Sequence, residues 1–132
     1  MNPRRPKNHW LKLKLKTMSV DQLVEQFRDF ALAQDDALLG GEQRRVNALF
    51  WKLADIADEL KSREGDQRTA LMRLYDHPNA QVRVKAIKNT LAVAPEKARR
   101  ALEILAASKE YPAAGEAGMS VWALEEGIFK PK

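Results

Sequence analysis

Residues 71–87 read LMRLYDHPNAQVRVKAI, and this segment is more informative about the architecture than any other. Leu71 and Leu74 belong to the end of an apolar helix. Pro78 cannot continue that helix, because its ring fixes φ and it has no backbone N–H. Asn79 is a favoured N-cap residue, so a second helix is predicted to begin at once. Two helices joined by so tight a corner form a hairpin of the kind that stacks in repeat proteins, since neither helix can bury its apolar face alone.

Helical spacing of apolar residues extends this prediction along the chain. It predicts helices over residues 20–38 and 42–63, separated by Gly40 and Gly41, with Ser19 and Gln22 as a capping box for the first. Further helices are predicted over residues 67–75 and 80–93, from Pro95 onward, and over 113–126. A second corner at Tyr111–Pro112 lies about 34 residues after His77–Pro78, the spacing of a two-helix repeat. We therefore expect an all-α protein of about six helices in three antiparallel hairpins.

Composition narrows the class of protein. The 132 residues include no cysteine, which excludes disulfides, thiolate metal sites and cysteine nucleophiles. An apolar run long enough to span a membrane is missing, and the basic N-terminus lacks the apolar core of a signal peptide, so we expect a cytoplasmic protein with no membrane contact. The formal charge of +5 is concentrated at one end, because residues 1–16 hold six basic side chains and no acidic one. The remaining residues are nearly neutral, with 17 basic and 18 acidic side chains.

The N-terminal residues differ from the rest in pattern as well as in charge. Pro3 and Pro6 interrupt them, and residues 10–16 alternate apolar and lysine side chains, which is the period of a strand. A single strand without a partner is only marginally stable. We therefore predict that residues 1–17 are a basic arm, either flexible or an upstream extension with Met18 as the natural start. Residues 18–132 would then form a single helical domain.

A family resemblance rests on the same corner. Residues 71–91 resemble a HEAT repeat, with Asp-x-Pro-Asn at the corner, Val-Arg at the start of the next helix and Ala three residues beyond that Arg. The segments MSVDQLV (18–24), 76–95 and WALEEGIFKP (122–131) are similar to a small bacterial family of uncharacterised HEAT-like proteins, a domain of unknown function. The resemblance covers residues 18–132 and implies a short HEAT-like α-α superhelix. It implies no activity. In the second hairpin Glu116 and Ala117 stand where Val-Arg is expected, so that repeat is degenerate.

Residues typical of catalysis or metal binding do not form a recognisable constellation. His9 and His77 are the two histidines, and neither has a second ligand at a spacing that suits a metal ion. No glycine-rich phosphate loop or nucleophile elbow is present. Asp55, Asp58 and Glu59 cluster on the predicted second helix, where a solvated face is favoured over a carboxylate active site. We expect no catalytic residue, no cofactor and no metal.

The charges outside the arm point to a binding surface instead. Residues 83–100, called here the basic patch, contain six basic side chains and one acidic side chain. In a HEAT-like stack the second helix of each hairpin lines the concave side, which is where the patch begins. Arg83 has a competing structural role, because the matching arginine of resembling repeats pairs with an acid such as Asp76 or one from the adjacent hairpin. The predicted partner-binding residues are Arg83, Lys85, Lys88, Arg99, Arg100 and Trp122.

Three functions remain open on these grounds. The favoured one is a non-catalytic protein–protein interaction module, a monomer or weak homodimer, whose partner is another protein. A specific version is an inhibitor or immunity-type protein that covers a nuclease's basic site with Asp55, Asp58 and Glu59. The alternative is a nucleic-acid-binding protein that uses the basic patch and the basic arm, although no aromatic residues are interleaved with the patch to stack on bases. An enzyme ranks third.

Overall fold

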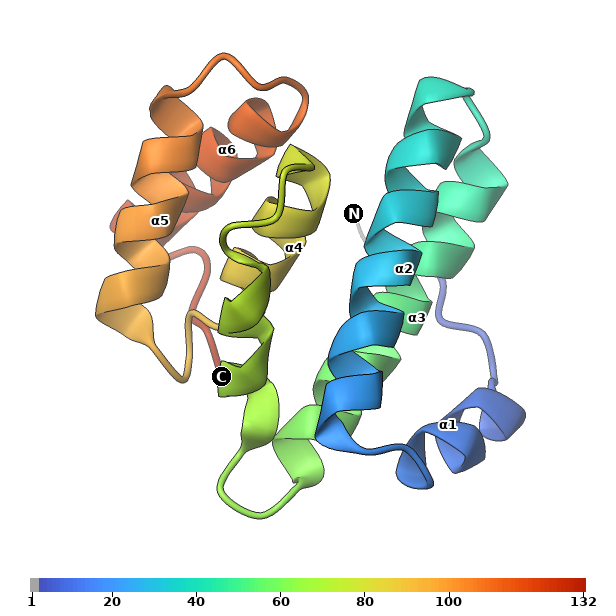
Figure 1. The fold of residues 1–132 in the computed structure, drawn as a ribbon. Helices are drawn as coiled ribbons and strands as arrows, with labels where there is room; N and C mark the ends of the chain where they lie inside the picture. Colours follow the sequence, from blue (N-terminus) through green and yellow to red (C-terminus); the bar gives the residue numbers. More distant parts are fainter. Residues whose placement is uncertain (1–2) are drawn as a thin grey trace. The chain divides into compact units, whose positions relative to one another are not determined.

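The computed structural model describes residues 3–132, and within them it has seven helices and no strand (Figure 1). The all-α prediction is therefore confirmed. The helices are α1 (His9–Lys16), α2 (Val20–Leu39), α3 (Gln43–Ser62), the 3-10 helix η1 (Gln67–Leu74), α4 (Ala80–Lys88), α5 (Pro95–Ala107) and α6 (Ala113–Glu125). In this described part, none of the helices is both long enough and apolar enough to cross a membrane.

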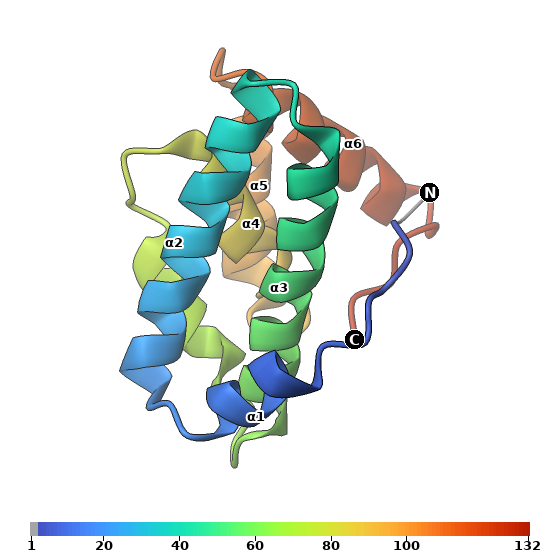
Figure 2. The ribbon, with the colours of Figure 1, turned by 90° about the vertical axis from the view of Figure 1, so that its right-hand side faces the viewer.

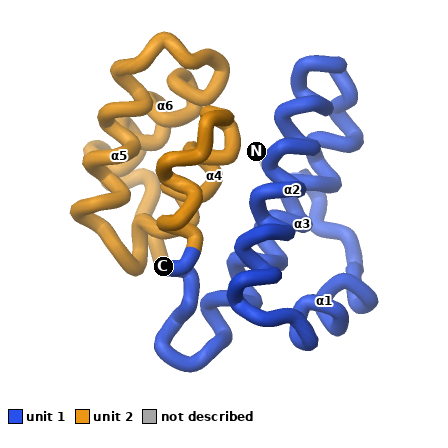
Figure 3. The backbone as a smooth tube through the Cα atoms, in the orientation of Figure 1, with its two compact units in different colours: residues 1–70 blue, residues 71–132 orange. Residues whose placement is uncertain are grey.

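The chain divides into two compact units, residues 1–70 and 71–132 (Figure 3). Each unit has its own core. The sequence-based boundary at residue 17 and the single domain over residues 18–132 stay predictions.

Unit 1 (residues 1–70) is built on the helix pair α2 and α3, which lie side by side and run in opposite directions (Figure 2). The predicted capping box is confirmed, because the Gln22 N–H donates to Ser19 Oγ at 3.1 Å and the Ser19 N–H donates to Gln22 Oε1 at 2.8 Å. Gly41 adopts a left-handed φ of 69° directly after α2, a conformation in which glycine has no steric penalty. The pair encloses fully buried side chains, among them Leu23, Phe27, Ala31, Ile56 and Leu60.

The strand-like alternation of residues 10–16 proves misleading, because all of these residues lie in α1, which packs against α3. A helix satisfies its backbone hydrogen bonds within itself, whereas a lone strand leaves them unpaired. Leu11 and Leu15 are four residues apart, so both reach the same face, and Leu15 is fully buried. Leu13 and Trp10 are left exposed by the same geometry. A helix that packs Leu11 and Leu15 against a neighbour is therefore favoured over a strand that has no partner strand.

Unit 2 (residues 71–132) packs α4, α5 and α6 around one core. Its buried members are Val84, Ile87, Leu91, Ala98, Leu102, Leu105, Ala113 and Ala117. After α6, Phe129 packs against this core, while Ile128 stays exposed.

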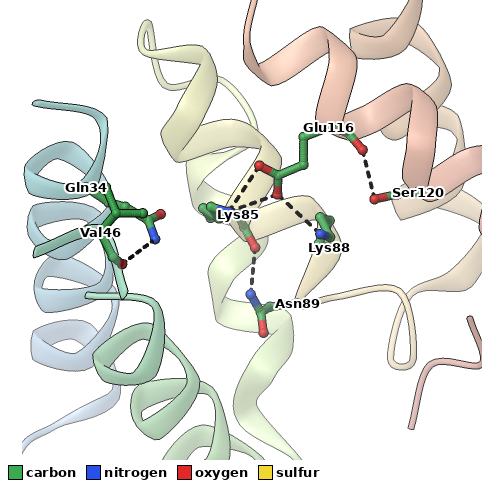
Figure 4. A network of polar contacts seen from close by, with 7 residues as sticks. All are labelled: Gln34, Val46, Lys85, Lys88, Asn89, Glu116 and Ser120. Atoms are coloured by element: carbon green, nitrogen blue, oxygen red, sulfur yellow. Dashed lines mark hydrogen bonds and ion pairs between the residues drawn. The ribbon is translucent and has the colours of Figure 1, made fainter. Parts of the chain in front are cut away.

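Helix α4 is shorter than predicted and ends at Lys88 rather than near residue 93. The side chains of Asn89 and Thr90 compete for the helical carbonyls. Asn89 Nδ2 donates to the Lys85 carbonyl at 2.8 Å (Figure 4). Thr90 Oγ1 lies 2.9 Å from the Ile87 carbonyl oxygen. The Thr90 hydroxyl is fully buried and also hydrogen-bonds the Tyr75 hydroxyl. Such local side-chain hydrogen bonds draw the backbone out of the helix into turns.

The predicted N-cap of α4 is confirmed and supports a quantitative prediction. Asn79 Oδ1 accepts hydrogen bonds from the N–H groups of Gln81 and Val82, at 2.8 and 3.1 Å. We expect Asn79→Ala to lower the free energy of unfolding by about 1 kcal/mol, because two N-terminal N–H groups lose their acceptor. Asn79→Asp keeps an acceptor and should lose much less. Urea unfolding of the three proteins measures this, and an alanine variant as stable as the wild type would contradict it.

Candidate protein-binding surface

All six predicted partner-binding residues lie in unit 2. Helix α4 carries Arg83, Lys85 and Lys88, α5 carries Arg99 and Arg100, and α6 carries Trp122. Four of the five basic residues are not free charges, because carboxylates of residues 110–125 pair with them. The basic patch is therefore largely neutralised within the unit.

Glu116 is the centre of this neutralisation. Lys85 Nζ donates to both of its carboxylate oxygens, at 2.9 and 3.1 Å, and Lys88 Nζ donates to one at 3.2 Å (Figure 4). The Lys85 side chain is 15% exposed and the Glu116 side chain 28%, so this is a half-buried cluster. Burial by itself raises the pKa of the Glu116 carboxyl, but the charges of Lys85 and Lys88 and their hydrogen bonds outweigh burial and hold that pKa below its usual range.

Arg83 has the structural role that the sequence favoured. Its guanidinium donates to Glu110 at 2.6 Å, and its side chain is mostly buried. The partner lies at the Tyr111–Pro112 corner of the adjacent segment, rather than at Asp76. The hydrogen bond from Arg83 lowers the pKa of the Glu110 carboxyl. Arg83 thus ties the start of α4 to the loop before α6.

The remaining basic residues of the patch are more accessible. Arg99 and Glu125 approach to 3.5 Å with both side chains largely in solvent, which is a weak pair. Arg100 and Lys97 are exposed, and within residues 3–132 neither has an ion-pair partner. Among the described residues of the basic patch, this short part of α5 therefore carries the unpaired positive charge.

Trp122 belongs to an exposed apolar strip, of which Trp122 alone was predicted from the sequence as a partner-binding residue. It is exposed on α6, and Met119, one turn earlier on the same face, is more exposed still. A Cβ atom on Gly115 would lie 3.8 Å from Cδ1 of Tyr111, so the exposed Tyr111 ring stands next to that glycine. Tyr111, Gly115, Met119 and Trp122 are called here the α6 strip. Their spacing of four, four and three residues is a helical period that the sequence contained.

The acidic cluster on α3 differs from the predicted solvated face. Asp55 is buried, with its side chain only 3% exposed, and it pairs with Arg5, which also pairs with Asp58 at 3.0 Å. Glu59 pairs with Arg63 at 2.6 Å. Of the three carboxylates only Asp58 is largely exposed. The expectation of a fully solvated acidic face is wrong for Asp55, because Arg5 from the N-terminal segment covers it.

Two shallow hollows accompany these features. One, of about 300 Å³, lies in unit 2 between the start of α5 and the C-terminal segment, where Arg99 and Leu124 line it. The other, of about 230 Å³, lies in unit 1 between α1 and α3 and is lined by Asp55 and Asp58. Among the residues that the structure describes, no group of three or more His, Asp or Glu side chains is arranged to hold a metal ion.

The comparison with known proteins gives the family. Residues 21–125 match the family described as Domain of unknown function (DUF2019). The chain belongs to this family. The resemblance to an uncharacterised bacterial family is thereby confirmed, whereas the HEAT-like character of DUF2019 stays a prediction. The crystal structure of the protein RPA1889 from Rhodopseudomonas palustris CGA009 is similar to this DUF2019 chain, with 54% identity and a TM-score of 0.87, covering 89% of this chain and 98% of that one. No curated protein matches the chain.

Proposed function

We propose that this DUF2019 protein is a non-catalytic module that binds another protein through the α6 strip. The observation that carries this proposal is the exposure of three large side chains: Met119 and Trp122 on one face of α6, and Tyr111, which precedes α6 and lies next to Gly115. Tryptophan, tyrosine and methionine are enriched at the centres of protein interfaces, where they bury large apolar areas. An exposed apolar strip of this kind is a typical sign of an interaction site.

Polar groups beside the strip suit the rim of such an interface. Glu125 follows Trp122 by three residues and pairs weakly with Arg99, and both side chains remain accessible. Rim charges of this kind contribute to encounter rate and specificity more than to affinity. The unpaired Arg100 and Lys97 would favour a partner surface with acidic groups at its edge.

The predicted arrangement of the helices as a HEAT-like superhelix is part of this proposal. We infer a short HEAT-like superhelix of three hairpins, supported by the α2–α3 pair, the α5–α6 packing and the capped corner between η1 and α4. A cytoplasmic location, inferred from the sequence, goes with it. The inhibitor version is less supported, since Asp55 and Glu59 are already paired within the chain.

The experiment compares affinity-tagged full-length baits in cells of the source organism. The baits are the wild type, Trp122→Ala and Leu39→Ala. Leu39→Ala is the control, because Leu39 is also an exposed large apolar residue but lies on α2. We expect a protein that the wild type and Leu39→Ala recover and that Trp122→Ala loses. Calorimetry with that purified partner should show at least a tenfold weaker Kd for Trp122→Ala, about 1.4 kcal/mol. Equal binding by the wild type and Trp122→Ala would reject the α6 strip as the site.

Nucleic-acid binding stays the second candidate because of α1. Lys12, Lys14 and Lys16 are exposed on this helix, together with Trp10, so cations and an aromatic ring share one element. Against it, most cations of the basic patch already have carboxylate partners. A mobility-shift assay with duplex and single-stranded DNA separates the two proposals. Salt-sensitive binding by the wild type that disappears when the three lysines become glutamine would favour the second candidate.

A further inference from the structure

One face of α3 carries an aromatic ring and two carboxylates in line. Trp51, Asp55 and Asp58 are spaced by four and three residues, which places them on the same side of the helix. The guanidinium of Arg5 meets all three. It pairs with Asp55, it lies 3.0 Å from Asp58 Oδ2, and its Cζ atom is 5.0 Å from the centroid of the Trp51 ring. The three side chains together form a complete receptor for one guanidinium group.

The buried carboxylate of Asp55 is the group in this site that needs a cationic partner. Its side chain is almost wholly buried, and a buried carboxylate without a counter-ion or hydrogen bonds is costly. Within residues 3–132 its cationic partner is Arg5, 50 positions away in sequence. The occupant is thus supplied by a distant segment rather than by α3 itself.

The segment that supplies Arg5 is held by little else. Residues 3–8 have no regular secondary structure, and Arg4, Pro6 and Lys7 on either side of Arg5 are exposed. The Arg5 side chain is itself 38% exposed. An occupant anchored mainly through one side chain is exchangeable, because a competitor with the same chemistry has few other contacts to replace.

We propose that Trp51, Asp55 and Asp58 form a binding site for a single arginine side chain in an extended segment of a partner protein, and that Arg5 occupies this site in the free protein. The site lies in unit 1 and is independent of the α6 strip, so it goes beyond the function proposed above. Binding of the partner replaces Arg5, and the N-terminal segment is released.

The geometry selects arginine over lysine. Arg5 reaches Asp55 and Asp58 through one nitrogen, Nη2, while its Cζ atom lies over the Trp51 ring. A guanidinium is more weakly hydrated than an ammonium and packs better on an aromatic face, so arginine loses less than lysine on entering this site. Lys12 and Lys16 line the neighbouring hollow, and Glu59 beside it is already paired with Arg63. The nearby charges thus accept one incoming cation and disfavour a second, so a single arginine is the expected ligand.

A labelled peptide tests the site in the full-length protein. The probe is a fluorescein-labelled peptide of residues 3–8 carrying Arg4→Ala, so that it holds one arginine. We expect Arg5→Ala protein to bind it at least tenfold more tightly than wild type by fluorescence polarisation at low salt, because the tethered Arg5 competes at a millimolar effective concentration. A probe with lysine at position 5 should bind the variant at least fivefold more weakly.

Matched variants identify the site. Adding Asp58→Asn to the Arg5→Ala protein should weaken binding at least fivefold, and this carboxylate is 64% exposed, so the fold does not depend on it. Adding Asp29→Asn instead removes a comparably exposed carboxylate on α2 and should change nothing. Trp122→Ala should also leave probe binding intact, which separates this site from the α6 strip. Equal binding by wild type and Arg5→Ala, no binding by either, or no effect of Asp58→Asn would overturn the proposal.

Discussion

Replacing Glu116 with glutamine is expected to lower the free energy of unfolding by about 2 kcal/mol, measured by urea unfolding at pH 7. The carboxylate accepts charge-assisted hydrogen bonds from Lys85 and Lys88, and Lys85 is mostly buried. Glutamine keeps the shape but removes the charge, so the ammonium of Lys85 remains half-buried without a counter-ion.

The same substitution should change how stability depends on acid. The pKa of Glu116 is lower in the folded protein than in the unfolded chain, so its stabilisation is present at neutral pH. That stabilisation is lost as the pH falls from the ordinary glutamate range, about 4.3, through the lower folded pKa. The stability difference between wild type and Glu116→Gln should therefore shrink in that range. A difference that is unchanged down to the acid transition would contradict the ion-pair explanation.

Two further variants isolate the cause. Glu125→Gln removes a similar carboxylate from the exposed pair with Arg99 and should cost less than about 0.5 kcal/mol. Combining Lys85→Met with Glu116→Gln removes both buried charges, and the double variant should be more stable than Glu116→Gln alone. If the double variant loses as much free energy of unfolding as the two single variants together, the two side chains act independently.

These ion pairs also explain where sequence reasoning succeeded and where it did not. The capping box at Ser19, the N-cap at Asn79 and Pro95 at the first turn of α5 are local features, and all three are confirmed. Each depends on residues within four positions, so a single sequence contains the whole interaction.

The ion pairs of the charged segments were not predicted, because the partner residues are distant in sequence. Glu110 and Glu116 lie 27 to 31 positions from the cations that they neutralise, and Arg5 lies 50 positions from Asp55. A count of charges along residues 83–100 cannot register carboxylates contributed by α6. The wrong prediction of a strand period over residues 10–16 has a similar origin, because the helix against which α1 packs is the distant α3. Tertiary contacts, not local pattern, decided those elements.

The α6 strip is an intermediate case. Its spacing was present in the sequence, but the same period also describes the buried face of a helix. Ala113 and Ala117 are buried and Val121 and Leu124 pack against the core, whereas Met119 and Trp122 face solvent. The exposure of these two large side chains supports a binding role for the strip, because large exposed apolar groups lower the solubility of a protein unless a partner covers them.

Leu102→Ala is expected to lower the free energy of unfolding by about 3 kcal/mol, the largest effect among these substitutions. Leu102 is fully buried among α4, α5 and α6, so truncation removes apolar contacts and leaves a cavity. Ile104 is the matched control, because it lies two positions away on α5 but is 67% exposed, and Ile104→Ala should cost less than about 0.5 kcal/mol. Chemical unfolding followed by circular dichroism compares the two. Similar losses for both variants would contradict the packing of unit 2, in which Leu102 faces the core and Ile104 faces solvent.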